Sequence, residues 1–425
     1  MGAKRDLVLI YGAALLRSFG IGLLGVLLGI YLFHGGASSA EIGLVIAIGL
    51  AGGAVATAMV SLRGDWFGRR RSLTVLALLS TVGGLGLLLS SHLAGLLPLA
   101  FIGMLNGMGT DRTAAFALEQ AIIPGLVSAE RRTWTLSWYN LVLDSGHALG
   151  ALGAGIPYIL QRWFAIDAGT SYKSVFLGYA GLNLLTVFLY LLLSSRVERA
   201  GAALPSPAIS VAPQTKRIVA KLAALFSLDS LGGGFLTDAL VSYWFFRRFG
   251  VPVQNLGILF FSVHVLNAVS HLGAAWLARR IGLLNTMVFT HLPSSLFLMA
   301  VPFAPSFKLA VVFFLLREGL VEMDVPTRQS YIAAVVRAED RTFASGITNL
   351  TRNVCWAITS SLAGIFMQNG AFSAPLLLGG GMKISYDIFL YRAFRGVKPP
   401  EEQGGTSKET MQLAIAAAIG KNKAS

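Results

Sequence analysis

The chain alternates between long apolar stretches and short polar segments. A helix needs about 20 apolar residues to cross the roughly 30 Å of hydrocarbon in a bilayer, so each stretch of this length predicts a transmembrane helix. The stretches lie near residues 7–33, 42–62, 72–91, 96–123, 133–160, 173–194, 218–246, 254–277, 283–303, 308–336, 342–368 and 374–395. The pattern predicts an all-α integral membrane protein of twelve transmembrane helices, six in each half.

The two halves repeat each other. Glu130–Thr133 and Glu339–Thr342 stand 209 residues apart, and each precedes a long apolar stretch. A second echo pairs Leu16–Gly22 with Leu228–Gly234. Equivalent helices should therefore enter the bilayer from the same side, which gives two parallel six-helix halves related by a pseudo-two-fold axis.

A polar segment separates the halves. Residues 196–217 contain Pro205, Pro207 and Pro213 among small and charged residues, which can neither span a membrane nor build a core. We expect an N-terminal six-helix bundle over 1–195, a cytoplasmic linker over 196–217, a C-terminal six-helix bundle over 218–396 and a cytoplasmic tail over 397–425.

Composition and loop charge agree with a membrane protein. The chain is 55% hydrophobic and 13% charged, whereas about a quarter of the residues of a soluble protein are charged. With both termini inside, the inner segments hold 23 Lys and Arg and the outer loops 5, so the positive-inside rule places both termini in the cytoplasm. We expect a multi-pass protein of the cytoplasmic (inner) membrane, monomeric, in contact with the lipid bilayer and without affinity for nucleic acid. The single cysteine, Cys355, excludes an internal disulfide.

The loop after the second stretch carries a recognisable motif. Asp65 is followed by Gly68 and then by Arg69, Arg70 and Arg71. This arrangement resembles the signature loop of the major facilitator superfamily, and the equivalent loop, 277–282, keeps the basic residues and Gly282 but has Arg279 where the Asp would stand. The resemblance covers the helix count, the central linker and the loop. It implies the fold of that superfamily, transport by alternating access, and a gating role for Asp65, Gly68, Arg69 and Arg70.

Many charged residues fall inside the apolar stretches. An unpaired charge at the bilayer centre costs about 2.5–3.5 kcal/mol, so most of them must pair, become neutral or face water. Residues near the membrane ends, such as Arg328 and Asp387, can instead extend to the interface. The embedded residues are Arg17, Arg112, Arg317, Arg328, Arg352, Lys383, Asp111, Glu119, Asp144, Asp229, Asp238, Glu318, Glu322, Asp324 and Asp387.

Helical periodicity groups these charges. At 100° per residue Arg112 and Glu119 share one face of the fourth helix, and Arg317, Asp324 and Arg328 share one face of the tenth. With the 209-residue offset, Glu119 of the first half is equivalent to Arg328 of the second. In the second echo, Arg17 is equivalent to Asp229. The resemblance implies that these four helices line the central cavity. Intrahelical or interdomain salt bridges that close one end of the cavity are the alternative.

The fifth and eleventh helices add a polar group. Asn140, Asp144 and His147 share a face of the fifth helix, and the eleventh helix carries the polar residues Asn349 and Arg352 in its corresponding part. An Asp three residues before a His can relay protons, and a satisfied polar patch between helices explains the same pattern. His264, Asn267 and His271 share a face of the eighth helix in the same way.

Three glycines lie between two acids of the seventh helix. Gly232, Gly233 and Gly234 separate Asp229 from Asp238. Glycines make a bend or local unwinding inexpensive, so this segment is a candidate gate, and close helix packing through small residues is the alternative.

These patterns predict a secondary transporter of a small solute, coupled to protons through buried carboxylates. Coupling is placed on Asp229: joined to Arg17 in one conformation the carboxylate is ionised, and separated in a low-dielectric site it takes up a proton. Export is favoured, because the helix-five residues Gly146, Gly150, Gly153, Gly155 and Pro157 loosely resemble the pattern of the superfamily's efflux antiporters.

Other functions stay open at this point. Proton-coupled uptake of a small organic ion or metabolite is one alternative, and a polytopic membrane enzyme or a transporter-derived sensor is another. The six histidines are scattered, so no catalytic group or metal-ligand spacing is expected, and neither a cofactor nor a nucleotide-binding loop is predicted. Charges of both signs suit a zwitterion, an organic anion or an amphiphilic cation as substrate.

Overall fold

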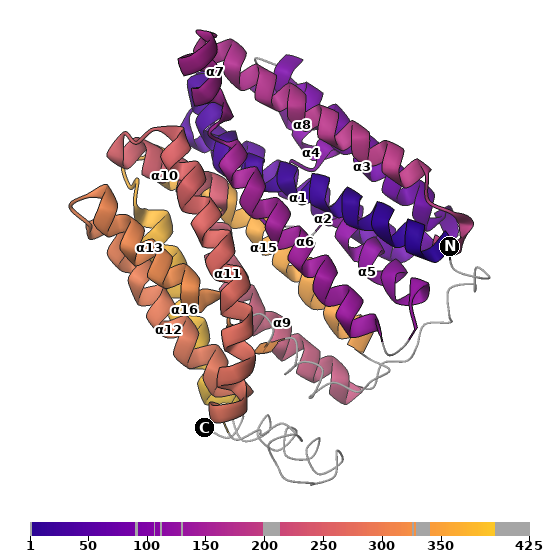
Figure 1. The fold of residues 1–425 in the computed structure, drawn as a ribbon. Helices are drawn as coiled ribbons and strands as arrows, with labels where there is room; N and C mark the ends of the chain where they lie inside the picture. The colour runs from indigo at the N-terminus through magenta and orange to yellow at the C-terminus, as the bar shows by residue number, and fades with distance from the viewer. Residues whose placement is uncertain are drawn as a thin grey trace. The chain divides into compact units, whose positions relative to one another are not determined.

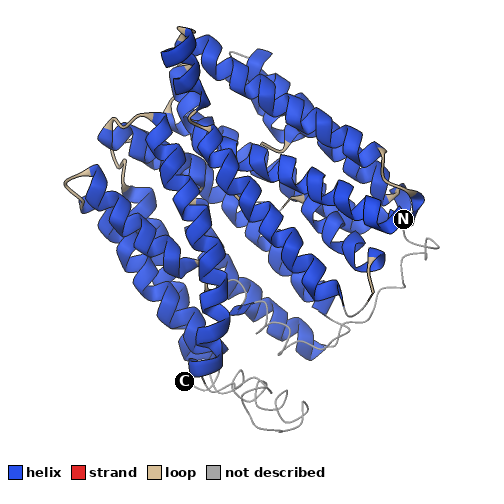
Figure 2. Ribbon diagram, in the orientation of Figure 1, coloured by secondary structure: helices blue, strands red, loops and turns tan. Residues whose placement is uncertain are grey.

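The fold is entirely helical over the residues that the structure describes (Figure 2). This computed structural model describes residues 2–89, 92–105, 107–110, 113–128, 131–198, 213–324, 327–328 and 341–395. Within these ranges the backbone alone is described for residues 62–66, 132–133, 213–219, 222, 272, 275, 341–347 and 349.

The helices follow the predicted order, and several predicted spans consist of two helices (Figure 1). The first half contains α1 (Gly2–His34), α2 (Ser39–Phe67), α3 (Arg69–Leu89), α4 (Leu93–Gly103), α5 (Ala114–Leu126), α6 (Arg132–Gly153), α7 (Ile156–Phe164), α8 (Ala168–Leu191) and the 3₁₀ turn η2 (Ser195–Val197). The second half contains α9 (Pro213–Gly234), α10 (Asp238–Phe249), α11 (Val253–Ile281), α12 (Leu283–Ala300), η3 (Val301–Phe303), α13 (Phe307–Val321), α15 (Arg341–Gln368) and α16 (Ala374–Phe394).

The chain divides into two compact units. Unit 1 consists of Met1–Pro205, Gly234–Val265 and Trp356–Pro375, and unit 2 of Ser206–Gly233, Leu266–Cys355 and Leu376–Ser425. Unit 1 thus combines the predicted first half with α10, the start of α11 and the end of α15. Both α11 and α15 continue from one unit into the other.

Helix α1 is the centre of unit 1, and α6 lies along it (Figure 1). Glycines allow the two backbones to approach, because a Cβ on Gly22 would overlap the carbonyl of His147 and a Cβ on Gly150 would overlap that of Phe19. The other side of α1 receives α10, where the Ser242 hydroxyl donates to the Val26 carbonyl over 2.8 Å. Most of α1 is therefore buried by protein.

The predicted fourth helix, 96–123, is wrong as a continuous span. Helix α4 ends at Gly103, with Met104 in the left-handed region (φ 51°), and Gly109 also has a positive φ (78°). Helix α5 begins only at Ala114, where the Thr113 side chain accepts from the Phe116 N–H. The described residues between the two helices, 104–105, 107–110 and 113, are not helical, and Arg112, which was placed on one helical face with Glu119, lies outside the described residues.

The seventh predicted helix is also broken, at the position that the glycines indicated. Helix α9 ends at Gly234 and α10 begins at Asp238, capped by the Thr237 side chain. This break meets the one between α4 and α5, since the Ala239 N–H donates to the Gly107 carbonyl over 3.0 Å. The predicted fifth span is likewise divided, into α6 and α7, and in the predicted tenth span α13 ends at Val321.

Seven helical segments of the described residues are long and apolar enough to cross a membrane. They cover Gly2–His34, Ser39–Ser61, Arg69–Leu89, Ala168–Leu191, Ala223–Phe249, Val253–Ile281 and Leu283–Phe303. The prediction of a helical protein that crosses the membrane several times agrees with these lengths.

Gly22→Ala is expected to lower the melting temperature, because its methyl group has no space beside the His147 carbonyl. Overpacking of this kind costs about 1–3 kcal/mol. Gly178→Ala on α8 is the matched control, since nothing lies within 4 Å of its added Cβ and alanine favours the helix. Thermal unfolding of both purified variants measures the difference, and equal melting temperatures would contradict the close packing of α1 on α6.

Candidate functional site

Unit 1 contains a buried ion pair between α1 and α5. Arg17 donates to both carboxylate oxygens of Glu119, over 3.1 Å from Nη1 to Oε1 and 2.6 Å from Nη2 to Oε2. The hydroxyl groups of Tyr139 and Tyr190 also donate to this carboxylate, over 2.7 and 2.8 Å. Glu119 has no exposed surface, yet both of its oxygens are saturated by donors.

A small cavity with a mostly apolar wall adjoins this ion pair. It has a volume of about 30 Å³, enough for about two water molecules, and lies among α1, α3, α8 and the segment between α4 and α5. Arg17, Ser80, Thr113, Asn183 and Tyr190 contribute polar atoms to its wall.

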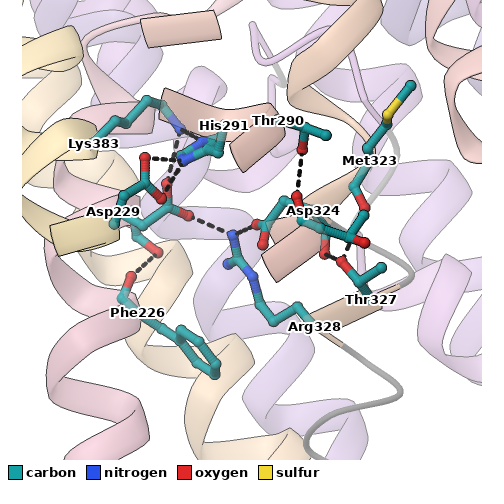
Figure 3. Close-up of polar contacts among 12 residues, drawn as sticks. Phe226, Asp229, Thr290, His291, Met323, Asp324, Thr327, Arg328 and Lys383 are labelled. Atoms are coloured by element: carbon teal, nitrogen blue, oxygen red, sulfur yellow. Dashed lines mark hydrogen bonds and ion pairs between the residues drawn. The ribbon is translucent and has the colours of Figure 1, made fainter. Parts of the chain in front are cut away.

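Unit 2 contains a larger buried charge cluster, centred on Asp229 of α9 (Figure 3). Lys383 of α16 donates to Asp229 Oδ1 over 2.8 Å, and Arg328 donates to Asp229 Oδ2 over 2.9 Å. Arg328 also pairs with Asp324, four residues earlier, and its guanidinium lies 5.0 Å from the centre of the Phe226 ring. Asp229 thus joins α9 to α16 and to the segment that follows α13.

His291 of α12 extends this cluster to a third carboxylate. Its Nδ1 lies 2.9 and 3.1 Å from the two carboxylate oxygens of Asp387 on α16. Its Nε2 lies 3.4 Å from Lys383 Nζ and 3.7 Å from Asp229 Oδ1. We call Asp229, His291, Asp324, Arg328, Lys383 and Asp387 the Asp229 cluster.

The two ion pairs occupy equivalent positions in the repeat, with their charges exchanged. In the first half the cation, Arg17, is on the first helix and the anion, Glu119, on the fourth. In the second half the anion, Asp229, is on the seventh helix and the cation, Arg328, lies in the tenth predicted span. The correspondence of Glu119 with Arg328 and of Arg17 with Asp229 therefore reflects equivalent roles in the two halves.

The pairing of Arg17 with Asp229 in one conformation stays a prediction. The structure gives each residue a partner within its own unit, Glu119 for Arg17 and both Lys383 and Arg328 for Asp229. Residues that are equivalent by a pseudo-two-fold axis lie in equivalent surroundings, so each meets the partner that its own half supplies.

A second group of candidate residues meets in unit 1, where α4–α5 and α9–α10 are broken. Asp238 packs on Gly109, which has no room for a Cβ there, and its Oδ2 lies 3.6 Å from Nε2 of His264. The rings of His264 and His147 are 5.7 Å apart. The structure thus places His147 of α6 beside His264 of α11, whereas the sequence had grouped His147 with Asp144 of the same helix.

Glu198 binds the loop between α2 and α3. Gly68 separates α2 from α3 with φ 99°, and the Glu198 carboxylate accepts from the backbone N–H groups of Arg69 and Arg70 over 2.6 and 3.1 Å. An acid at this position satisfies the free N–H groups at the start of α3. The Asp65 side chain lies outside the described residues.

The remaining predicted residues are described one by one. Arg317 pairs with its neighbour Glu318, and Asp324 pairs with Arg328. Asn140 is exposed, and Asp144 and Arg352 are half-buried. Asp111 and Arg112, and the side chain of Asn349, lie outside the described residues. Across the described part of the chain no group of three His, Cys, Asp or Glu is placed to hold a metal ion.

His291 was not predicted as a site residue, and Lys383 and Asp387 were given no role in the site. Extension to the interface was the alternative for Asp387, but its side chain is fully buried and bonded to His291. Arg328 was given the same alternative, yet it is held by Asp229 and Asp324. An i, i+4 spacing of Lys383 and Asp387 on one helix was the available signal.

Comparisons with known proteins agree with this architecture. The family profile described as the Major Facilitator Superfamily matches residues 10–321. The chain is 26% identical over 426 residues to the uncharacterized membrane protein YJR124C of Saccharomyces cerevisiae. The aligned region covers 93% of this chain and 95% of the yeast protein.

Solved structures share the fold. A D-xylose-proton symporter superposes with a TM-score of 0.71 at 15% identity, covering 96% of this chain and 100% of the symporter. The nucleoside transporter NupG gives 0.69 at 13% identity, covering 92% and 98%. The resemblance to the major facilitator superfamily, carried by the loop motif at residues 65–71 and the internal repeat, is thereby confirmed. The chain belongs to the Major Facilitator Superfamily and is a multi-pass membrane transporter of a small solute, not an enzyme.

Proposed function

We propose that this protein is a proton-coupled secondary transporter whose coupling site is the Asp229 cluster. The observation that carries the proposal is the imbalance of charge in a buried site. Three carboxylates, Asp229, Asp324 and Asp387, face two permanent cations, Arg328 and Lys383. Because a buried net charge is costly, such a site gains by binding one proton.

The location of the cluster supports a coupling role. It joins α9, α12, α16 and the segment after α13 through charge-assisted bonds. A change of protonation alters which of these elements are held together, and it shifts a conformational equilibrium by the difference in proton affinity between the states. The Arg17–Glu119 pair lacks this property, because one cation and two phenol groups satisfy its single carboxylate.

For the solute we propose a small polar organic molecule. The fold relatives include a D-xylose-proton symporter and a nucleoside transporter, which motivate a first screen. Ligand-dependent stabilisation of the purified protein against heat would compare pentoses, nucleosides, amino acids, organic anions and organic cations. Export remains a prediction. The glycines of α6 that suggested it, such as Gly146 and Gly150, pack against α1.

A transporter-derived sensor is the alternative from another class. A sensor would bind solute without moving it, so uptake into proteoliposomes separates the two. Transport of any screened solute across a sealed membrane would exclude the sensor.

Asp229→Asn is expected to separate coupling from transport. The amide keeps the shape of the side chain but removes the charge that Lys383 and Arg328 hold. Exchange of the solute identified in the screen should persist in proteoliposomes, while its accumulation ratio under an imposed pH gradient should fall to about one. Asp167→Asn, at the exposed cap of α8, is the matched control and should accumulate solute normally. If the Asp229 variant still accumulates solute against the solute gradient, the coupling site does not depend on Asp229.

Arg17→Met is expected to destabilise the protein, because it leaves the Glu119 carboxylate buried without a cation. Removing one partner of a buried pair costs about 3–5 kcal/mol. The double variant Arg17→Met with Glu119→Gln should recover most of that loss and retain pH-driven transport. Thermal unfolding and the proteoliposome assay measure the two effects. If the double variant folds but loses coupling, the pair has more than a structural role.

A further inference from the structure

His291 stands between an anion and a cation. On one side its Nδ1 faces both oxygens of Asp387, at 2.9 and 3.1 Å. On the other side its Nε2 faces Lys383 Nζ at 3.4 Å, with Asp229 Oδ1 only slightly farther at 3.7 Å. Both nitrogens are therefore placed against groups whose hydrogen-bonding character is fixed.

We propose that His291 is the group of the Asp229 cluster that takes up the proton, and that this proton transfers Asp229 from Lys383 on α16 to His291 on α12. The inference rests on the proposed function and names the residue and the exchange of partners through which coupling works.

The contacts define the tautomer of the imidazole. A carboxylate is only an acceptor and an ammonium group is only a donor. Nδ1, which faces Asp387, must therefore carry a hydrogen, and Nε2, which faces Lys383, must offer its lone pair. The ring that fits this arrangement is neutral, protonated at Nδ1 alone.

A proton from water that binds Nε2 changes this arrangement. The new N–H bond uses the lone pair that Lys383 had faced, and two cationic groups then stand 3.4 Å apart. Asp229 Oδ1 is the nearby acceptor that both groups approach, at 2.8 Å from Lys383 and 3.7 Å from His291. Repulsion between the two cations favours a state in which the imidazolium binds Asp229 and the Lys383 ammonium moves away.

Charge balance favours the same step. Arg328 serves both Asp324 and Asp229, and Lys383 serves Asp229. Asp387 receives its hydrogen bonds from His291 within the described part of the chain. With a neutral imidazole the six groups carry one net negative charge, and with an imidazolium they carry none.

Other groups around the histidine are accounted for. The Tyr386 ring meets the imidazole edge to face at 6.0 Å and belongs to α16, as do Lys383 and Asp387. Asp229 belongs to α9, and Asp324 and Arg328 follow α13. Glu322 is half-buried and acts electrostatically on Arg328. Of these, the two groups outside the Asp229 cluster are the neutral Tyr386 and the acidic Glu322, and neither disfavours a cation at His291.

The exchange would alter the helix contacts of α9. Before proton uptake Asp229 ties α9 to α16, and afterwards it ties α9 to α12 while Arg328 still holds its other oxygen. Asp387 keeps the imidazole oriented in both states, which makes it a positioning residue.

The test uses the full-length protein in lipid nanodiscs, labelled with ¹⁵N in histidine and lysine side chains, with protons as the ligand. Over a pH titration the His291 signals should pass from the form protonated at Nδ1 alone to the doubly protonated form. The Lys383 signal should change in step. A single protonation state of His291 throughout the titration, or a hydrogen on Nε2 alone at the alkaline end, would overturn the proposal.

Variants identify the source of the lysine response. In His291→Asn the pH dependence of the Lys383 signal should be lost, and in His92→Asn, an exposed histidine at the start of α4, it should persist. A Lys383 response that survives in the His291 variant would assign the proton to a carboxylate and refute the inference. Because the wild-type spectra need no variant, misfolding of His291→Asn would not leave the question open.

Transport separates this inference from the proposed function. If a pH gradient drives no solute in the wild-type protein, the proposed function fails, while the spectra still decide whether His291 exchanges partners. If the gradient drives transport, His291→Asn and Lys383→Met should both lose accumulation yet keep solute exchange. Coupled transport by either variant would contradict the exchange mechanism.

Discussion

The need to neutralise charge in an apolar surrounding governs the interior of this protein. Asp229 meets that need with two cations and a nearby imidazole, and Glu119 meets it with one arginine and two phenols. An unpaired charge in either place would cost several kcal/mol, a large share of the stability of a folded domain. The helices that carry these groups are therefore held in register by electrostatics as well as by packing.

The same construction appears twice, with different consequences. Each half has an ion pair between its first and fourth helices, and the signs of the two charges are reversed between the halves. The surroundings then diverge, since Glu119 is saturated by neutral phenols, whereas the Asp229 cluster adds a lysine, a histidine and two more carboxylates. The first pair has a fixed charge count. Under the proposed function, the second has a charge count that depends on a proton.

Much of the fold could be predicted from the sequence, because long apolar stretches, the repeat and the loop motif each depend on local chemistry. The glycines before Asp238 marked the break between α9 and α10. The break between α4 and α5 was missed, because the apolar residues of these two helices give the whole range 96–123 the length of one span, although residues 104–113 include several polar residues. Hydropathy measures the transfer of side chains into lipid and says little about where the backbone departs from a helix.

The candidate site was harder to predict, for a reason that the ion pairs illustrate. Periodicity places residues on a face of one helix, but it does not say which other helix that face meets. Arg17 and Asp229 were identified as important from their equivalence, but the partners that each meets in its own half, Glu119 for Arg17 and Arg328 for Asp229, could not be derived from that equivalence. Lys383 and Asp387 attracted little attention for the same reason, since their partners, Asp229 and His291, lie on distant segments.

The position of Asp229 along its helix connects the charge cluster to the break. It lies five positions before Gly234, where α9 ends and where one compact unit gives way to the other along the chain. Beyond the break α10 begins with Asp238, and the adjacent Ala239 is bonded to the Gly107 carbonyl in the other non-helical segment. A helix that is tied at Asp229 and interrupted five residues later can change its contacts on one side of the break without unwinding α10, whose own hydrogen bonds begin at the Thr237 cap. Under the proposed function, a movement of α9 would therefore require changes only in the few torsion angles of Phe235, Leu236 and Thr237 rather than in a whole helix.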